Sequence, residues 1–206
     1  MEKRQWQWIR EDHITYAVWD IQFWHYVYTA SLGFREMHHT VDAVPNGKSS
    51  MELYGLENGG SRVALVRPIN RSAISHVESF LRMHGDHSVQ HVAYGIRNLE
   101  VFVAEMKEKG FRFVGTVKQR ADLFGPIKQI FAKRFDASLT PASGSFFEFV
   151  ERPERTDEEG IADFFASSVA GQLYEDVEEE VARAEHECFV SDRTLTKGDG
   201  HEAPRN

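Results

Sequence analysis

Two stretches of this chain repeat the same pattern, and the repeat limits the fold more than any other feature. Residues 12–34 and 90–111 align over a strand-like segment and a helix-like segment, and His13 falls opposite His91. Spaced similarity of this kind indicates an internal repeat, in which each copy is one supersecondary unit. We therefore expect two similar modules.

Each copy starts as a strand and continues as an amphipathic helix. Asp20 and Asn98 stand where the helix begins, and such side chains cap helix N-termini by accepting backbone N–H groups. Gly33 and Gly110 stand where the helix ends, a position that favours glycine. The sequence thus predicts the same helix, with the same start and stop, in both copies.

Three further strand-like runs follow each helix. They cover residues 34–41, 50–56 and 62–69 in the first copy, and 112–117, 128–135 and 145–151 in the second. Each copy therefore reads βαβββ. The predicted fold class is α+β, with two tandem βαβββ modules forming an open mixed-sheet barrel and a helix added at the C-terminal end.

The predicted organisation has six segments. They are an N-terminal extension (1–11), the first module (12–71), a connecting helix and loop (72–86), the second module (87–153), a C-terminal helix (154–190) and a disordered tail (191–206). A capping box at Thr156 and Glu159 indicates the C-terminal helix, and apolar residues recur along it mostly at four-residue spacing. The tail is polar and has no periodicity.

The charge balance argues against several classes of partner. With 24 Lys and Arg against 32 Asp and Glu the net charge is -8, so neither nucleic acid nor an anionic membrane surface is expected to bind. No stretch is apolar enough to predict a transmembrane segment. Cys188 is the only cysteine, which fits a reducing, cytoplasmic location. The sequence leaves open whether the protein forms a homodimer.

Glu148 is unexpected in a strand that should be buried. It lies in the segment GSFFEFVER, residues 144–152, where alternation places Phe146, Glu148 and Val150 on one face. A buried carboxylate without a partner is costly, and proteins tolerate one mainly when it pairs with a cation or binds a metal. Glu148 therefore predicts a cation or a metal ion nearby.

His13 and His91 are the predicted partners of Glu148. They occupy equivalent positions in the repeat, so a pseudo-two-fold arrangement of the modules would bring them close together. Two imidazoles and one carboxylate form the facial triad that suits Fe(II) with open coordination positions. The counterpart of Glu148 in the first module is an apolar position near Val63. We expect His13, His91 and Glu148 to be metal ligands.

Four motifs in the chain also carry a family resemblance. They are DHI at 12–14, VQHVA at 89–93, QIFAK at 129–133 and FFEFVER at 146–152. With the paired βαβββ units, they resemble the vicinal-oxygen-chelate superfamily, and within it the catalytic C-terminal half of the 4-hydroxyphenylpyruvate dioxygenases. The resemblance spans about residues 12–185. It implies that His13, His91 and Glu148 bind Fe(II).

The resemblance also implies a substrate pocket. Its polar groups would be Ser50, Asn70, Gln90 and Gln129, its apolar walls would be Phe131 and Phe146, and His76 stands where the family usually has a glutamine. The C-terminal helix would close over the site as a lid, around residues 164–174. The chain has no counterpart of the family's non-catalytic N-terminal half, so a stand-alone catalytic unit is expected.

The implied activity is the oxidative decarboxylation and hydroxylation of a 2-oxo acid with Fe(II) and O2, with a role in specialised biosynthesis. The acid would resemble 4-hydroxyphenylpyruvate or be another aromatic or bulky aliphatic 2-oxo acid. Two alternatives stay open. One is a glyoxalase-like isomerase or ring-cleaving dioxygenase that uses Zn or Mn, although glyoxalase-type sites usually have more carboxylate ligands. The other is a metal-free, resistance-type binding protein, which commonly lacks the triad.

Overall fold

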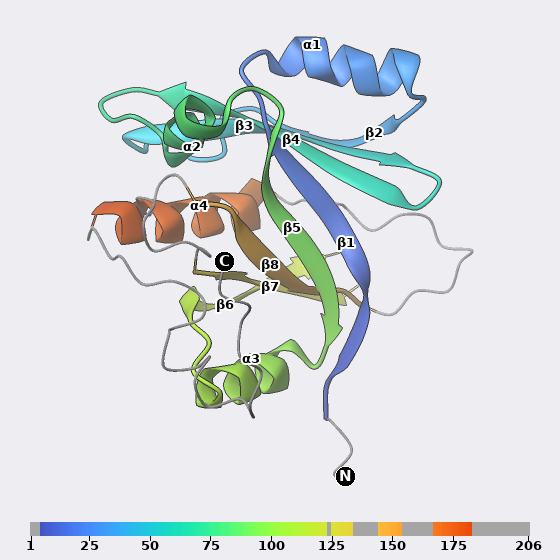
Figure 1. Cartoon of the computed structure of the whole chain (residues 1–206), viewed down its shortest axis with the longest axis vertical. Helices are drawn as coiled ribbons and strands as arrows, with labels where there is room; N and C mark the ends of the chain where they lie inside the picture. The colour runs from blue at the N-terminus through green and yellow to red at the C-terminus, as the bar shows by residue number, and fades with distance from the viewer. Residues whose placement is uncertain (1–4, 123–124, 134–143, 154–166, 183–206) are drawn as a thin grey trace, which may run out of the picture.

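The structure is a computed structural model that describes residues 5–122, 125–133, 144–153 and 167–182 (Figure 1). In chain order the elements are β1 (Gln7–Ala17), α1 (Ile21–Tyr26), η1 (Val27–Ser31), β2 (Arg35–Thr40), β3 (Ser49–Asn58), β4 (Ser61–Asn70), α2 (His76–His84), β5 (Ser88–Arg97), α3 (Leu99–Glu108), β6 (Phe113–Asp122), β7 (Gly125–Ala132), β8 (Phe146–Glu151) and α4 (Ser167–Ala182). The predicted tail, residues 191–206, lies outside the described residues. No helix in the described ranges is long and apolar enough to cross a membrane.

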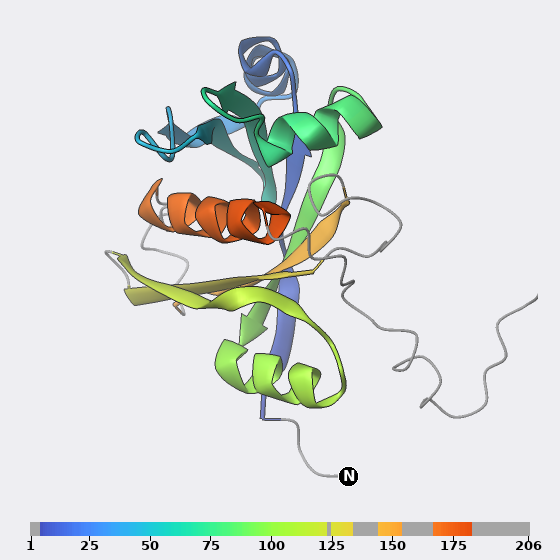
Figure 2. The ribbon, with the colours of Figure 1, turned by 90° about the vertical axis from the view of Figure 1, so that its left-hand side faces the viewer.

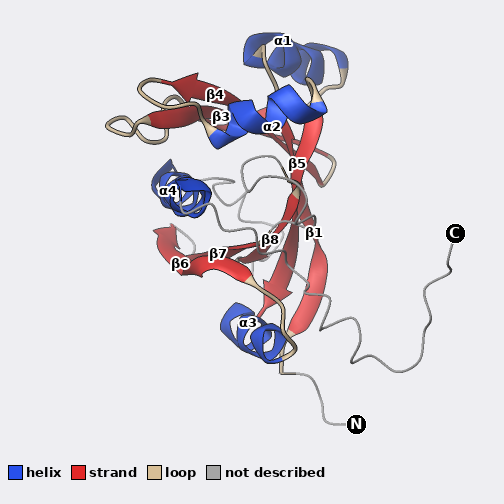
Figure 3. Cartoon of the chain, turned by 60° about the vertical axis from the view of Figure 1, so that its left-hand side comes forward, coloured by secondary structure: helices blue, strands red, loops and turns tan. Residues whose placement is uncertain are grey.

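Within the described residues, one mixed sheet of eight strands organises the fold, in the order β2-β3-β4-β1-β5-β8-β7-β6. Its halves are alike, because β4 pairs in parallel with β1 as β8 pairs in parallel with β5. The halves meet at the antiparallel pair β1–β5. They curl toward each other, and α4 lies between them (Figures 2 and 3). The predicted fold class is confirmed.

The two repeat helices begin differently. Asp20 caps α1 as predicted, since its carboxylate accepts the N–H of Phe23 at 3.0 Å. Asn98 instead has a φ of 59°, and its side chain makes no capping hydrogen bond. The carboxylate of Glu151 accepts the N–H groups of Asn98 and Leu99, each at 3.0 Å. The prediction that Asn98 caps the second helix is therefore wrong, because a residue of β8 takes that role.

Both helices end at the predicted glycines. Gly33 has a φ of 71° and Gly110 a φ of 91°, a left-handed conformation that other residues rarely adopt. Before Gly33, α1 continues as the short π-helix η1. β1 begins at Gln7, so residues 7–11 of the predicted N-terminal extension belong to the first strand.

The buried apolar residues form clusters on the two sides of the sheet, an outer side covered by α1 and α3 and an inner side that faces α4. The outer cluster beneath α1 contains Val18, Ile21, Tyr28, Tyr54, Leu56, Val63 and Leu65. The outer cluster beneath α3 contains Trp6, Ile96, Leu99, Phe102, Val103, Phe113, Ile130, Ala132 and Phe149. The inner cluster joins the first module to α2 and α4, with Ala17, Met51, Leu53, Ala64, Val66, Val77, Phe80, Leu81 and Tyr174. Side chains alternate along a strand. In β1, β5 and β8, the residues that lie between the outward-facing ones therefore point to the inner side of the sheet.

Candidate metal centre and pocket

Two bulges in the β1–β5 pair place a buried polar residue ahead of each histidine. The pairing skips Asp12 just before His13, and it skips Gln90 just before His91. A bulge leaves one extra residue on a strand and changes the direction of nearby side chains. Asp12 and Gln90 are both buried. They occupy equivalent positions in the repeat, so the distortion is duplicated along with the strands.

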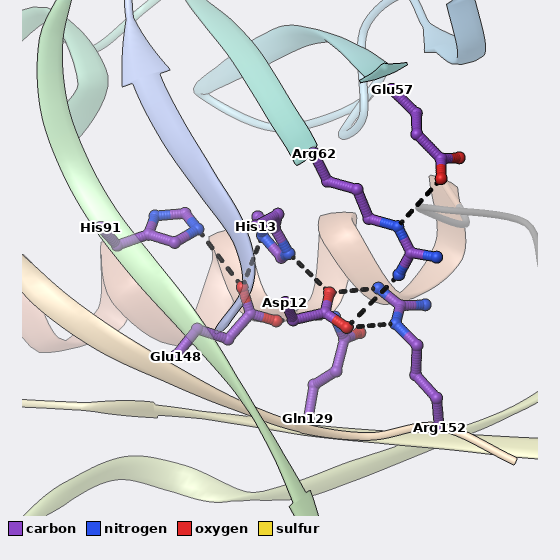
Figure 4. Close-up of polar contacts among 8 residues, drawn as sticks. All are labelled: Asp12, His13, Glu57, Arg62, His91, Gln129, Glu148 and Arg152. Carbon is purple, nitrogen blue, oxygen red and sulfur yellow. Dashed lines mark hydrogen bonds and ion pairs between the residues drawn. The ribbon is translucent and has the colours of Figure 1, made fainter. Parts of the chain in front are cut away.

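His13, His91 and Glu148 meet on the inner side of the sheet, from the neighbouring strands β1, β5 and β8 (Figure 4). Oε2 of Glu148 lies 3.3 Å from Nε2 of His13 and 3.3 Å from Nε2 of His91. All three side chains are buried. Among the described residues, this is the group of His, Cys, Asp and Glu that could hold a metal ion, with ligand atoms within 4.8 Å of one another.

The donor set fits a divalent metal ion. Neighbouring ligands of an octahedral ion with bonds of about 2.1 Å lie about 3 Å apart. The two distances of 3.3 Å are close to that spacing. Two imidazoles and a carboxylate on one side of an ion leave its other positions open. The structure therefore brings the three predicted ligands into an arrangement that can hold a metal.

Burial and charge set the ionisation of these groups. Burial acts to raise the pKa of Glu148, but the hydrogen bonds and charges of His13 and His91 outweigh it and lower the pKa to about 2. Burial lowers the pKa of His91, which favours the neutral imidazole that binds metals. Burial also acts to lower the pKa of His13, but Asp12 and Glu148 outweigh it and raise that pKa. A metal ion would replace the proton that His13 holds.

Asp12 orients His13. Its Oδ1 lies 2.9 Å from Nδ1 of the imidazole, so the Nε2 atom is left to face Glu148. Arg152 donates one hydrogen bond to each oxygen of Asp12, both at 2.8 Å, and Arg62 lies 3.6 Å away (Figure 4). Carboxylates of this kind fix the tautomer and the direction of metal-binding histidines. The sequence gives Asp12 and Arg152 as motif residues but does not indicate this role.

The other two members of the triad are held in different ways. Gln129 donates from Nε2 to Oε1 of Glu148 at 2.6 Å, which leaves Oε2 for the histidines. The ring of His91 stacks on Phe146, with centroids 4.8 Å apart, and contacts the ring of Phe131 at 5.4 Å. One histidine is thus oriented by a carboxylate and the other by aromatic rings.

A pocket opens from the triad toward α4. Its lining includes the predicted substrate residues His76, Gln90, Gln129, Phe131 and Phe146. It also includes Thr15, Met51, Leu53 and Val66, which the sequence does not single out for this purpose, and Leu173 and Tyr174 of the segment expected to act as a lid. Thr15 and Val66 could be placed near the site from strand alternation, whereas the expectation for the helix came from the family resemblance alone.

Ser50 and Asn70 are not in the pocket lining. Oγ of Ser50 accepts the N–H of Val44 at 2.8 Å. Oδ1 of Asn70 accepts the N–H of Ser75 at 3.0 Å, and its amide donates to Glu78. Both side chains thus support nearby backbone and the start of α2, and the substrate role expected of them stays a prediction.

The helix α4 lies between the two halves of the sheet (Figure 3), and it lines the pocket with Leu173 and Tyr174. Side-chain contacts fasten it to both modules. The hydroxyl of Tyr174 lies 2.7 Å from that of Ser49 in β3. Glu178 accepts the backbone N–H of His76 at 2.9 Å. On the other side, Lys118 of β6 forms an ion pair of 3.1 Å with Asp176. Of the segment expected to act as a lid, residues 164–166 lie outside the described residues, and Leu173 and Tyr174 form part of the pocket wall.

Replacing Gly171 with alanine is expected to loosen α4. A Cβ atom at this position would lie 2.7 Å from the backbone oxygen of Ala43, so the helix would have to shift. Alanine alone would favour the helix by about 1 kcal/mol. Hydrogen exchange should therefore speed up in residues 167–182 of Gly171→Ala, while the exposed Gln172→Ala serves as the control and should not show it. Unchanged exchange in both variants would mean that this contact does not hold the helix.

Comparison with known proteins identifies the family. A model of the Glyoxalase/Bleomycin resistance protein/Dioxygenase superfamily matches residues 12–125. The chain belongs to this superfamily. It is the vicinal-oxygen-chelate superfamily that the sequence motifs resemble, and its enzymes typically depend on a divalent metal ion. The matched span contains His13 and His91 and ends before Glu148. No curated protein sequence matches the chain.

Solved structures of the superfamily share the fold of this chain. A variant of 4-hydroxymandelate synthase from Streptomyces coelicolor is 22% identical, with a TM-score of 0.67 over 83% of this chain and 55% of that chain. The chain therefore spans about half the length of that structure. The hypothetical protein BH1468 from Bacillus halodurans is 22% identical, with a TM-score of 0.53 over 75% of this chain and 99% of that chain.

A methylmalonyl-CoA epimerase is also similar, with 20% identity and a TM-score of 0.52 over 75% of this chain and 100% of that chain. At these identities the likeness shows the fold alone. Because a synthase and an epimerase both share it, the fold does not select one reaction. The choice of reaction depends on the donor set and on the pocket.

Proposed function

We propose that the protein is a non-haem Fe(II)-dependent dioxygenase that oxidatively decarboxylates and hydroxylates a 2-oxo acid. The carrying observation is the buried set of two imidazoles and one carboxylate, which is the ligand set typical of Fe(II) oxygenases. Ala93 of the second module pairs with Glu148, and its repeat equivalent Thr15 pairs with Ala64. Ala64 is therefore the first module's counterpart of Glu148. A fully buried alanine cannot supply the additional carboxylate usual in glyoxalase-type sites.

The pocket lining supports a small acid rather than a coenzyme A thioester. The residues described as lining it include no Arg or Lys, so the charge of a bound acid would be met by the metal. Phosphate groups of a coenzyme A substrate call for cationic partners, which this lining lacks. Met51, Leu53, Val66 and Leu173 offer an apolar surface for a hydrophobic substituent. These properties fit an aromatic or bulky aliphatic 2-oxo acid.

Each residue of the site has a task in this reaction. When bound, Fe(II) would supply the redox chemistry with O2 and a template for a chelating oxo acid. His13, His91 and Glu148 would hold the ion while leaving positions open. Asp12 and Gln129 keep His13 and Glu148 in their directions. Phe131, Phe146 and the residues of α4 keep water away from the reacting groups.

Oxygen consumption tests the proposal directly. Protein loaded with Fe(II) under anaerobic conditions would be mixed with O2 and a panel of 2-oxo acids, including 4-hydroxyphenylpyruvate, phenylpyruvate and 4-methyl-2-oxopentanoate. At least one acid should cause O2 uptake matched by an equal release of CO2, without added 2-oxoglutarate. Protein loaded with Zn(II) should consume no O2. The proposal fails if no acid causes uptake, and catalysis by the Zn(II) or Mn(II) form without O2 would favour an isomerase.

A further inference from the structure

Three polar atoms in the pocket wall are buried without a hydrogen-bond partner among the described residues. One is Nδ1 of His91, whose Nε2 faces Glu148, and the other two, Oγ1 of Thr15 and Nε2 of Gln90, belong to residues outside the triad. Thr15 and Gln90 are 1% and 4% exposed. Leaving a buried polar atom unsatisfied is unfavourable, so native proteins rarely do it without a reason. Both atoms border the same pocket, which indicates that a ligand supplies the missing hydrogen bonds.

Outside the triad, the other polar groups of the described lining are already engaged within the protein. Gln129 donates to Glu148 at 2.6 Å, and the hydroxyl of Tyr174 lies 2.7 Å from that of Ser49. Nδ1 of His76 lies 2.8 Å from Glu178. Apart from Nδ1 of His91, spare hydrogen-bonding capacity in the described pocket wall is therefore concentrated at Thr15 and Gln90.

Thr15 and Gln90 both lie at the metal end of the pocket. Thr15 follows His13 by two residues on β1, so their side chains share a face, and it pairs directly with His91 of β5. Gln90 is the bulged residue next to His91. The apolar side chains of Met51 and Leu53 come from β3, which is separated from β1 by β4. A ligand that touches Thr15 and Gln90 would thus do so with its metal-binding end.

We propose that Thr15 is a specificity-determining residue that hydrogen-bonds the carboxylate end of the substrate, beside Gln90, whose place in the substrate pocket the family resemblance already implies. The inference rests on the proposed function, in which an oxo acid binds the metal through its carboxylate and ketone oxygens. Hydroxyl and amide groups can both donate to such oxygens. These two donors would bind the carboxylate in place of a Lys or Arg side chain, which the described lining lacks. Recognition of the acid would then be independent of its hydrophobic substituent.

Thr15→Val separates this role from a structural one, because valine keeps the shape and removes the hydroxyl. If the hydroxyl is unsatisfied until substrate binds, the metal-free variant should melt about 2–4 °C higher than the wild type. A hydroxyl that serves the fold would give the opposite shift. Thr40→Val is the matched control, since Thr40 is buried outside the pocket lining and its hydroxyl is paired with His38. This control should melt lower and bind ligands normally.

Calorimetry of the Fe(II)-loaded protein without O2 measures binding apart from turnover. The probes are phenylpyruvate and 4-methyl-2-oxopentanoate, whose acid ends are identical and whose substituents differ. Thr15→Val should weaken the binding of both by about tenfold or more, which corresponds to losing one hydrogen bond to a charged group. Thr15→Ser keeps the hydroxyl and should stay within about threefold of the wild type.

The outcomes distinguish the two proposals. If the wild type binds neither acid and shows no oxygen uptake, the proposed function and this inference fail together. If the wild type binds both acids and Thr15→Val binds them equally well, the inference alone is overturned. It is also overturned if Thr15→Val melts lower and loses Fe(II) affinity, or if Thr15→Ser is as weak as Thr15→Val. Weaker binding of both acids, with rescue by serine and no loss of stability, supports it.

Discussion

Replacing Glu148 with glutamine should lower Fe(II) affinity by about 100-fold or more and abolish oxygen uptake. The change removes the anionic ligand, and even residues that only support metal ligands typically contribute 10–100-fold to affinity. Glutamine keeps nearly the same volume, and its side-chain oxygen can still accept the hydrogen bond from Gln129. The metal-free fold should therefore persist. Competition with a chromogenic chelator would measure the affinity, and circular dichroism would check the fold.

Glu52→Gln is the matched control for that experiment. Glu52 is also a buried carboxylate, but it pairs with His39 and Arg67 on the first module and does not line the pocket. The control should bind Fe(II) as the wild type does, although its stability can change. Equal Fe(II) affinity in Glu148→Gln and the wild type would contradict the assignment of Glu148 as a ligand.

Replacing Arg152 with methionine should destabilise the fold by about 3–5 kcal/mol, because it leaves the buried carboxylate of Asp12 without its bidentate partner. Fe(II) affinity should also fall about 10–100-fold, since Asp12 orients His13. Urea unfolding at neutral pH would measure the stability. Lys109→Met is the control, since its ion pair with Glu105 is far more exposed, and it should cost less than about 1 kcal/mol.

The pH dependence of this loss follows from the pKa of Asp12. Burial acts to raise that pKa, but Arg152 and His13 outweigh it and hold the pKa well below the usual range. The ionised pair therefore stabilises the fold above the unfolded-state pKa, and that stability is lost as the pH falls toward the folded-state value. The difference between wild type and Arg152→Met should shrink in acid. A difference that grows on acidification would contradict the pairing.

The repeat made most of the fold predictable. It indicated two βαβββ modules, and strand alternation placed Glu148 on the same face as Phe146, which the structure confirms. The equivalence of His13 and His91 indicated their proximity, and their rings lie 5.7 Å apart. These features could be predicted because they depend on period and symmetry, which a single sequence displays.

Contacts between distant segments could not be predicted in the same way. Glu151 replaces Asn98 as the cap of α3, although the two residues are 53 positions apart. Even a contact over six residues escaped prediction, since the hydroxyl of Ser50 accepts the N–H of Val44, while the substrate role that the family resemblance implies for Ser50 stays a prediction. Strand alternation places Thr15 on the same face as His13 but indicates no role for it. Its importance depends on the absence of a hydrogen-bond partner among the described residues, which a sequence cannot reveal.

A bulge occurs at equivalent positions in the two halves of the sheet, but a different residue fills it in each half. In the first half the extra residue is an anion that serves the neighbouring imidazole, and in the second it is an amide that borders the pocket. The two positions have therefore diverged in chemistry without losing their common geometry. Deleting the extra residue at either position would leave the following histidine opposite its present strand partner, and would remove only the buried polar side chain beside it. Shortening the first half here would therefore remove the carboxylate that orients His13 without changing the face on which His13 lies.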